Sequence, residues 1–306
     1  MKPKIVVILG PTAVGKSALA LDLAGQLDGE IVNADSQQVY RYMDIGTGKP
    51  SLADRERVRH HLIDVVNPDQ EFNAAMFRQL ASEVIFQIVE RKRKAIVCGG
   101  TGLYLKALTR GLFEGPAQDP KIRCKLEMQI AESGLHSIYQ RLVEIDPTVV
   151  STIHPNDRLR TIRALEVHQL TGKPISQWQK EHRFQEQPFE VLKIGLNCER
   201  AELYDRINRR SAAMVDAGFL DEVRGLAVRG YSLDLKPLRS VGYAQLAKVV
   251  RGDVTLDAAL EEMQQETRHL AKRQLTWFRG DKEIRWFHPK QAPEIFAAVK
   301  AFFSNR

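Results

Sequence analysis

The octapeptide GPTAVGKS at residues 10–17 is the stretch whose residue types and spacing point most directly to a chemistry. Gly10 and Gly15 let the backbone turn sharply, so that several N–H groups face the same point. These N–H groups and the start of a following helix attract an anion. Lys16 adds a positive charge, and the hydroxyl of Ser17 can reach a magnesium ion. The pattern predicts a phosphate-binding loop (P-loop) for a diphosphate or a triphosphate.

The flanks of the octapeptide supply the context that a P-loop requires. Residues 4–9 are apolar and predict a strand, and residues 17–27 predict a helix. The alternative is a chance glycine-rich turn, which the order strand, loop and helix disfavours. The pattern leaves open which phosphate compound binds and which atom is attacked.

Asp35 follows a second apolar segment, within the stretch NADSQQVY at residues 33–40. A carboxylate there would face the P-loop and could accept a proton from an attacking nucleophile. The alternative is a helix cap, a role that both Asp and Ser favour. Ser36, Gln37 and Gln38 make this stretch unusually polar for a cap, and glutamine amides can recognise the edge of an adenine.

The stretch GGTGLY at residues 99–104 follows another predicted strand. In a Walker-type ATPase this strand end usually supplies an aspartate for magnesium. Here it supplies glycines and Thr101, and Asp64 is the only rival for the aspartate role. Glycines allow a flat substrate to approach closely, and Thr101 could donate a hydrogen bond to it. The alternative is a tight turn between a strand and a helix.

Two further stretches combine basic residues with a helical pattern. In HPNDRLRTIRALEV at residues 154–167, Arg160 and Arg163 lie three positions apart on one helix face and suit phosphates. Residues 267–279 interleave basic residues with Trp277 and Phe278, which fits an RNA backbone and stacked bases. The alternative for the second stretch is a surface helix whose aromatic side chains lie in the core.

The elements that must position these residues alternate in the first hundred positions. Strands are predicted at residues 4–9, 30–33, 61–66 and 94–98, and helices at 17–27 and 74–91. This alternation predicts a parallel sheet with helices on both faces. Because ligands bind at the carboxyl ends of such strands, the loops after Leu9, Asn33 and Cys98 should meet.

The sequence changes character near residue 116. Residues 117–189 read as helices punctuated by prolines and predict an all-helical insertion domain. Residues 1–116 and 190–306 are then the α/β core. The expected elements of its second half are strands at 191–196 and 284–288 and helices at 201–230, 256–278 and 293–303.

Composition limits the class of protein and its surroundings. Lys and Arg number 45 against 38 Asp and Glu, a net charge of +7, which fits either a solvated surface or a nucleic-acid partner. Three dispersed cysteines without a C-x-x-C motif exclude a zinc knuckle and suit a reducing compartment. Neither a signal peptide nor a membrane-spanning stretch is evident. We expect a cytoplasmic protein that does not contact membranes.

Taken together, these motifs resemble one family, the tRNA dimethylallyltransferases of the bacterial type, also called tRNA isopentenyltransferases. The resemblance extends over residues 10–279 and is carried by GPTAVGKS, NADSQQVY, GGTGLYL, HPNDRLRTIRALEV, RSVGY and AKRQLTWFR. Many kinases and ATPases share the first motif, whereas the combination in this order is specific. From the cysteine count we expect no C-terminal zinc finger of the kind that the eukaryotic relatives carry.

The resemblance implies a reaction. The family transfers the dimethylallyl group from dimethylallyl diphosphate to the exocyclic amine of the adenine 3′-adjacent to the tRNA anticodon, and diphosphate leaves. The implied partners are the tRNA anticodon stem-loop and dimethylallyl diphosphate, with Mg²⁺ as cofactor, held in part by Ser17. A monomer is expected. No water needs activation, which agrees with the missing aspartate.

The resemblance also implies roles for individual residues. Asp35 accepts the proton of the amine, Thr101 orients the base, and Lys16 neutralises charge on the diphosphate. The expected diphosphate-binding residues are Gly10, Thr12, Ala13, Val14, Gly15, Lys16, Ser17 and Arg210. The expected tRNA-binding residues are Asp35, Ser36, Gln37, Gln38, Thr101, Arg123, Leu159, Arg160, Thr161, Ile162, Arg163, Arg239, Lys272 and Arg273.

Two other functions fit parts of the pattern. A small-molecule kinase of the P-loop class, with the insertion as its lid, would bind ATP and transfer a phosphoryl group. A non-catalytic RNA-binding protein that senses a nucleotide would bind tRNA without changing it.

Overall fold

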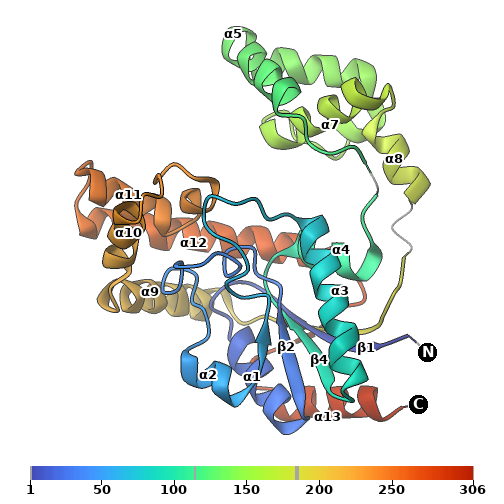
Figure 1. Ribbon diagram of the computed structural model, residues 1–306, viewed down its shortest axis with the longest axis vertical. Helices are drawn as coiled ribbons and strands as arrows, with labels where there is room; N and C mark the ends of the chain where they lie inside the picture. The colour runs from blue at the N-terminus through green and yellow to red at the C-terminus, as the bar shows by residue number, and fades with distance from the viewer. Residues whose placement is uncertain (1, 114, 183–185, 306) are drawn as a thin grey trace. The chain divides into compact units, whose positions relative to one another are not determined.

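The computed structural model describes residues 2–113, 115–182 and 186–305. The chain falls into two units (Figure 1). Met1–Thr109 and Gln187–Arg306 form an α/β unit, and Arg110–Glu186 form a helical unit. The predicted class, a P-loop parallel sheet flanked by helices with an all-helical insertion, is confirmed. The units divide at residues 110 and 186, against the expected insertion bounds of 117 and 189.

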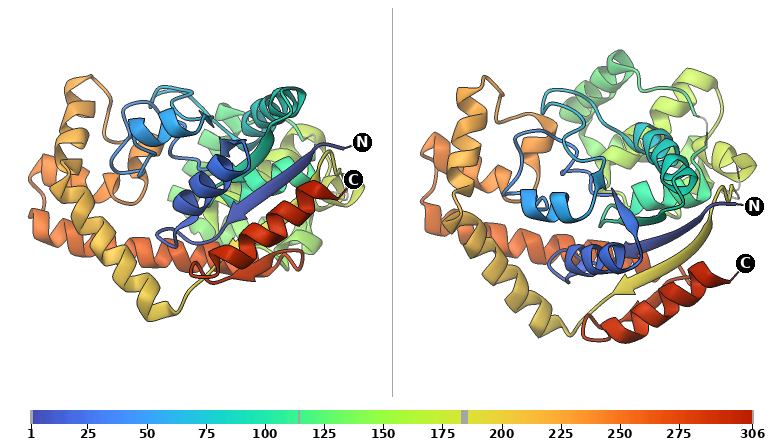
Figure 2. Two further views of the ribbon diagram at one scale, coloured as in Figure 1. Left: turned by 90° about the horizontal axis from the view of Figure 1, so that it is seen from below. Right: turned by 60° about the horizontal axis from the view of Figure 1, so that its bottom comes forward.

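The α/β unit is built on a six-stranded sheet with the order β3-β2-β4-β1-β5-β6 and parallel pairing throughout (Figure 2). The strands are β1 (Lys4–Leu9), β2 (Gly29–Asn33), β3 (His60–His61), β4 (Lys94–Cys98), β5 (Glu190–Leu196) and β6 (Arg285–Phe287). The central strands are covered on both faces, which is why they read as continuous apolar runs in the sequence.

The helices of the two units follow the chain order. In the α/β unit they are α1 (Lys16–Gln26), α2 (Leu52–Arg57), α3 (Ala74–Glu90), α4 (Gly102–Arg110), α9 (Arg200–Asp216), α10 (Phe219–Val228), α11 (Tyr243–Arg251), α12 (Leu256–Arg279) and α13 (Ala292–Ser304), with a 3-10 helix at Lys236–Arg239. In the insertion they are α5 (Pro120–Ile145), α6 (Pro147–Val150), α7 (Arg158–Thr171) and α8 (Ile175–His182).

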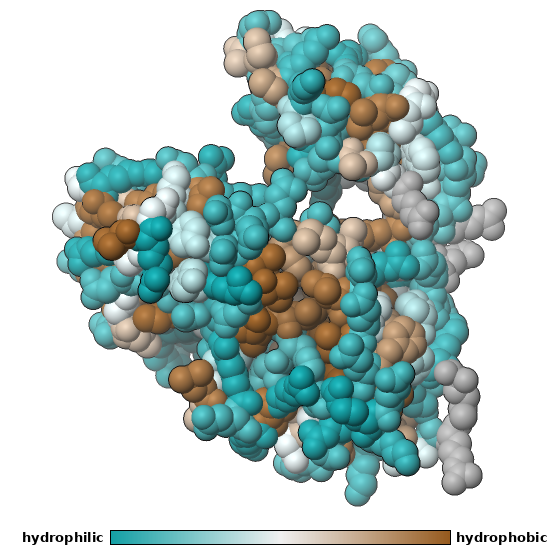
Figure 3. All heavy atoms as spheres, viewed as in Figure 1, coloured by the Kyte–Doolittle hydropathy of each residue, from teal (hydrophilic) through white to brown (hydrophobic). Residues whose placement is uncertain are grey.

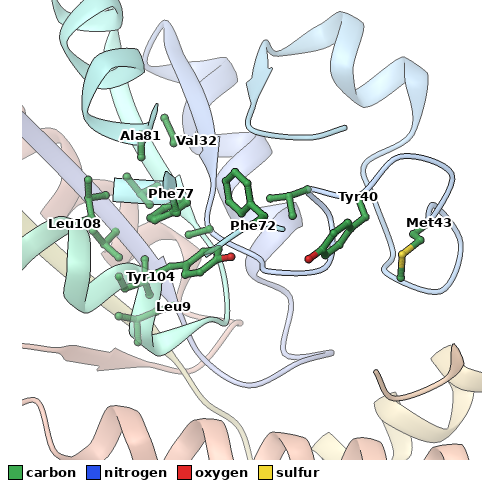
Figure 4. Close-up of a cluster of buried hydrophobic side chains, with 14 of the residues drawn as sticks. Leu9, Val32, Tyr40, Met43, Phe72, Phe77, Ala81, Tyr104 and Leu108 are labelled. Carbon is green, nitrogen blue, oxygen red and sulfur yellow. The ribbon is translucent and has the colours of Figure 1, made fainter. Parts of the chain in front are cut away.

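Alternate residues of the strands feed two apolar clusters, one on each face of the sheet. In β1, Val7 belongs to the cluster that includes side chains of α3 and α4, and Val6 belongs to the cluster that includes α1, α9 and α13. In the first cluster Phe77 stacks on Tyr104, with ring centroids 4.5 Å apart (Figure 4). The period of two in the strands therefore fixes which helices cover which face.

Two predicted strands are shorter than expected. The strand expected at 61–66 overlaps β3 (His60–His61) at His61 alone, because Leu62 and Asp64 adopt left-handed backbone angles (φ 60° and 58°) that a strand does not accommodate. The carboxylate of Asp64 instead pairs with Lys49 and Arg55. The strand expected at 284–288 spans Arg285–Phe287.

The carboxyl ends of β2 and β4 are joined by their backbones. Ala34 donates its N–H to the carbonyl of Cys98 at 2.8 Å, and Thr101 donates its N–H to the carbonyl of Ala34 at 3.3 Å. A Cβ at Gly99 would overlap the backbone of Ala34, so only glycine permits this approach. The segments that follow the two strands are therefore held side by side.

In the part of the chain that the structure describes, no helix is both long and apolar enough to cross a bilayer. The face drawn in Figure 3 is mostly hydrophilic, with a hydrophobic patch near the middle of the view and smaller hydrophobic groups elsewhere.

The insertion has its own core and a buried ionic cluster. Leu126 and Leu142 of α5 pack with Leu165 of α7. Glu166, which is fully buried, accepts hydrogen bonds from the guanidinium groups of Arg123 (2.8 and 3.0 Å) and Arg163 (2.7 Å) and from the N–H of Asp119 (2.8 Å).

Glu166 also gives the insertion a pH dependence. Burial alone would raise the pKa of Glu166, but the hydrogen bonds from Arg123 and Arg163 outweigh it and hold that pKa below its usual range. A carboxyl with a lowered pKa stabilises the fold above its unfolded-state pKa of about 4.3, and this contribution disappears as the pH falls through its folded-state value.

We predict that Glu166→Ala destabilises the insertion by about 2–4 kcal/mol. Breaking a buried ion pair usually costs about 3–5 kcal/mol. We expect a smaller cost because Arg123 and Arg163 are partly exposed, so water can solvate their guanidinium groups in the variant. Urea unfolding followed by circular dichroism measures the change, with Glu132→Ala on the exposed side of α5 as the control. The difference from wild type should shrink in acid. Equal unfolding of both variants at neutral pH would contradict the role of Glu166.

Candidate active site

Three loops meet at the carboxyl ends of the neighbouring strands β2, β4 and β1, as expected from the topology. A cavity of about 80 Å³ is lined by Lys16 of the P-loop, Asp35 after β2, Gly99 after β4 and Arg210 of α9. An adjoining cavity of about 120 Å³ shares Asp35 and Arg210 and extends toward apolar side chains of α9–α12. Groups of both charge signs therefore face the same space.

The P-loop backbone has the geometry that anion binding requires. Gly10 and Gly15 have φ values of 142° and 107°, and Ala13 between them has 63°. A Cβ at Gly10 would lie 2.5 Å from the carbonyl of Leu196, so the loop passes directly against β5. Gly15 begins α1 without a side-chain cap, which leaves the first N–H groups of the helix for an anion. Val14 is buried and can take part only through its backbone.

Lys16 has charged neighbours of both signs, Asp35 and Arg210. Its Nζ donates a hydrogen bond to the carbonyl of Pro11 at 2.7 Å. Burial lowers the pKa of Lys16 to about 8, against the raising effects of Cys98 and Asp35, while Arg210 lowers it further. The free protein therefore holds this proton more weakly than an exposed lysine does. A bound anion would raise the pKa again.

Asp35 lies in a turn and not at the start of a helix. Its N–H donates to Asn33 Oδ1 at 3.3 Å, and its Oδ1 accepts from the N–H of Gln37 at 2.8 Å. Because no helix begins between residues 34 and 40, the alternative interpretation of Asp35 as a helix cap is wrong. Among the residues that the structure describes, no hydrogen bond occupies the second carboxylate oxygen of Asp35, so it can bind a ligand.

Thr101 connects the loops after β2 and β4. Its Oγ1 accepts a hydrogen bond from the N–H of Ser36 at 3.0 Å. The hydroxyl that accepts this bond still has its proton to donate. Gln37 lines the larger cavity, and its Oε1 is a buried acceptor without a partner among the described residues. These two side chains can offer a donor and an acceptor to a flat polar ligand.

Arg210 packs against a glycine on the other side of the cavities. A Cβ at Gly48, which has a φ of 61°, would overlap the guanidinium of Arg210. Burial lowers the pKa of Arg210, and the nearby Asp35 carboxylate opposes the shift. The prediction that Arg210 reaches the P-loop region agrees with its place in the cavity lined by Lys16.

Gln274 is a residue of the site that sequence reasoning missed. Its Oε1 accepts from the N–H of Thr12 at 2.8 Å, and its Nε2 donates to the carbonyl of Gly100 at 3.1 Å. The side chain thus bridges the P-loop and the glycine loop, and it occupies the N–H of Thr12. The motif AKRQLTWFR contained Gln274, but nothing in the sequence marked partners so far away along the chain.

The expected RNA-binding residues of the insertion divide into two groups. Leu159 (76% exposed) and Arg160 lie on the surface of α7. Thr161 and Ile162 are buried, so their side chains support the helix and offer no surface to RNA. The guanidinium groups of Arg123 and Arg163 are bound to Glu166.

The expected RNA-binding residues of the α/β unit differ in exposure, and those around Asp35 and Thr101 are only partly exposed. Arg239, Lys272 and Arg273 are exposed, and Arg239 donates to the carbonyl of Asp234 at 2.8 Å. For residues 267–279, the alternative that places aromatic side chains in the core holds for one of the two aromatic residues. Phe278 belongs to the core, whereas Trp277 is 43% exposed.

The comparisons with known proteins agree with this geometry. The family described as IPP transferase matches residues 38–281. The tRNA dimethylallyltransferase 2 of Syntrophus aciditrophicus is 50% identical over 98% of this chain and 97% of its own length. The chain belongs to the tRNA dimethylallyltransferase family. The tRNA dimethylallyltransferase of Geobacter metallireducens is 48% identical over 99% of this chain and 98% of its own.

Solved structures support the same assignment. The tRNA isopentenylpyrophosphate transferase of Bacillus halodurans has a TM-score of 0.73 and 39% identity, over 98% of this chain and 97% of that chain. A eukaryotic dimethylallyltransferase acting on tRNA has a TM-score of 0.83 and 28% identity, over 99% of this chain and 80% of that chain.

The described residues contain no cluster of three or more His, Cys, Asp or Glu side chains able to hold a metal. Ser17 lines the smaller cavity, and its hydroxyl is an oxygen donor of the kind that Mg²⁺ prefers when a phosphate supplies the other oxygens. Asp64 is paired with Lys49 and Arg55, so it does not supply the missing aspartate.

We predict that the affinity for dimethylallyl diphosphate falls as the pH rises above about 8. The anion favours protonated Lys16, and the free protein loses this proton near its lowered pKa. The loss should reach up to about tenfold per pH unit, measured by calorimetric titration between about pH 7 and 9.5.

Lys16→Met is the matched control because the ligand titrates identically with both proteins. This variant should bind more weakly and retain only the pH dependence of the ligand. Parallel pH profiles for wild type and Lys16→Met would show that Lys16 is not the titrating group.

Proposed function

We propose that this chain transfers the dimethylallyl group from dimethylallyl diphosphate to the exocyclic amine of the adenine 3′-adjacent to the tRNA anticodon, releasing diphosphate. The observation that carries the proposal is one cavity lined by an anion cradle, with Lys16 and Arg210, and by a carboxylate, Asp35. Membership in the tRNA dimethylallyltransferase family supports it. We further propose that a monomer is active.

The P-loop side of the cavity would bind the diphosphate. The N–H groups of Gly15 and of the start of α1, together with Lys16 and Arg210, stabilise the negative charge that grows on the leaving oxygen. Ser17 would hold a magnesium ion, which supplies further positive charge to the diphosphate. The N–H of Thr12 is occupied by Gln274, so Thr12 can contribute only its hydroxyl.

The other side of the cavity would receive the adenine. The amine nitrogen forms a bond to the first carbon of the allyl group while the bond from that carbon to oxygen breaks, and its electrons leave with the diphosphate. The free carboxylate oxygen of Asp35 accepts the proton that the amine loses. Gln37 Oε1, a buried acceptor without a described partner, accepts the remaining N–H, and Thr101 orients the ring.

The target base must leave its stack to enter such a cavity. In a single-stranded loop this costs less than in a duplex. We propose that exposed residues of both units bind the RNA: Leu159 and Arg160 of the insertion, and Arg239, Lys272 and Arg273 of the α/β unit. Arg123 and Arg163 would act indirectly, by bracing α5 and α7 through Glu166.

Transfer of a labelled group tests the proposal. The protein is incubated with unmodified tRNA, Mg²⁺ and dimethylallyl diphosphate labelled in the allyl group, and the RNA is then digested. Label on one adenosine, with an equal amount of diphosphate released, is the expected result. ATP consumption with unlabelled RNA would favour a kinase, and tRNA binding without label would favour a non-catalytic binder.

We predict that Asp35→Asn lowers kcat by roughly 10²–10⁴-fold, the usual contribution of a general base. The asparagine can still accept the hydrogen bond from Gln37, so the turn is retained and diphosphate affinity should change little. Steady-state kinetics with calorimetry measure both quantities. Equal losses in affinity and in kcat would show that Asp35 shapes the site instead of accepting the proton.

We predict that Arg160→Ala raises the KM for tRNA and reduces the salt slope of binding by roughly 0.7–0.9, the value for one phosphate contact. The KM for dimethylallyl diphosphate should not change. Filter binding at several salt concentrations measures the slope. Arg141→Ala, which removes a guanidinium bonded to Gln129 within α5, is the control. The same slope for wild type and Arg160→Ala would exclude this contact.

A further inference from the structure

The wall of the larger cavity is a loop without regular structure. Residues 41–48 connect Tyr40 to Lys49 without a helix or strand. Gly46 and Thr47 of this loop line the cavity together with Asp35 and Arg210. Gly48 lies against the guanidinium of Arg210. Interactions that hold this loop in position therefore also determine the position of the Arg210 guanidinium.

Glu222, in the first turn of α10, binds the loop through its backbone. Its Oε2 accepts hydrogen bonds from the N–H groups of Asp44 (2.8 Å) and Ile45 (2.7 Å), and its Oε1 accepts from Gly46 (3.1 Å). The hydroxyl of Tyr243 donates to Oε1 at 2.5 Å. All four partners are neutral donors. The position at a helix N-terminus also stabilises the negative charge.

Close packing leaves this loop little freedom. A Cβ at Gly46 would overlap the rings of Phe219 and Tyr243, which meet edge to face with centroids 4.8 Å apart. Burial and the neighbouring Glu222 carboxylate raise the pKa of Tyr243, so its hydroxyl remains a donor. The backbone of the loop is thus seated on two buried rings beside the carboxylate.

The loop is also bound from the side that carries Asp35. Gln38 Nε2 donates to the carbonyl groups of Thr47 and Gly48, both at 3.1 Å. The loop therefore lies between two polar anchors, Gln38 near Asp35 and Glu222 on α10. Loss of either anchor would let Thr47 and Gly48 move and would change the position of the Arg210 guanidinium.

We propose that Glu222 is a positioning residue for the transfer reaction. It holds the loop of residues 41–48 in place, so that Arg210 and Asp35 face one cavity. This inference rests on the proposed function, since it assigns Arg210 to the diphosphate. A carboxylate is required because every partner is a donor. The NH₂ group of a glutamine would meet at least one of these N–H groups without an acceptor.

Glu222→Gln tests the proposal by the binding of inorganic diphosphate, measured by calorimetry, and by steady-state kinetics. Diphosphate affinity should fall about tenfold, the scale of one lost charge-assisted hydrogen bond, and the KM for dimethylallyl diphosphate should rise equally. Asp221→Asn is the matched control, because Asp221 is exposed on the same turn and pairs only locally with Arg224 (2.9 Å). Wild-type affinity in Glu222→Gln would overturn the proposal.

A double-mutant cycle separates positioning from general stabilisation. In an Arg210→Ala background the effect of Glu222→Gln on diphosphate affinity should disappear, because there is then no guanidinium whose position the loop could fix. An equal loss in both backgrounds would contradict positioning.

If Glu222→Gln does not fold, Tyr243→Phe removes one donor and should reduce affinity by about two- to fivefold. Unchanged affinity in that variant would overturn the proposal. Because inorganic diphosphate is the probe, the result is independent of transfer to tRNA.

Discussion

The site depends on the burial of two cations that the fold brings to one cavity. Lys16 lies at the start of α1, after the loop that follows β1, and Arg210 lies on α9. Burial is the main cause that lowers the pKa of each group. Arg210 lowers the pKa of Lys16 further, and Cys98 and Asp35 offset only part of the total effect. A diphosphate would compensate these buried charges, so binding and the stabilisation of a leaving diphosphate have the same electrostatic origin.

A P-loop does not by itself decide which atom is attacked, since the same fold serves many reactions. What distinguishes this site is the end of β4, where Gly99, Gly100 and Thr101 stand in place of a metal-binding aspartate. Gly100 lets Gln274 of α12 approach, so that Gln274 connects the P-loop to the loop that would hold the base. The arrangement provides an anion cradle, a carboxylate and space for a flat ligand.

The sequence predicted the parts of the site that are local in the chain. The P-loop, Asp35 and Thr101 each follow a strand, and the ends of parallel strands must meet at one edge. Gln274 and Glu222 could not be predicted, because their partners lie 262 and 178 residues away and no spacing rule connects them. The motif around Arg160 predicts that Thr161 and Ile162 bind RNA as well, but successive residues of a helix point in different directions, and the side chains of these two are buried. The prediction of a strand at 61–66 was wrong because Leu62 and Asp64 adopt left-handed backbone angles, which an apolar sequence pattern does not indicate.

The central claim is that carbon, and not phosphorus, is the atom attacked above the P-loop. Dimethylallyl diphosphate labelled with oxygen-18 in the bridge between carbon and phosphorus tests this directly. After one turnover with tRNA, the diphosphate is analysed by mass spectrometry. We expect all of the label in the diphosphate, because the carbon–oxygen bond breaks. Label in dimethylallyl alcohol, or in any product that keeps the bridging oxygen on carbon, would mean attack on phosphorus and would contradict the account.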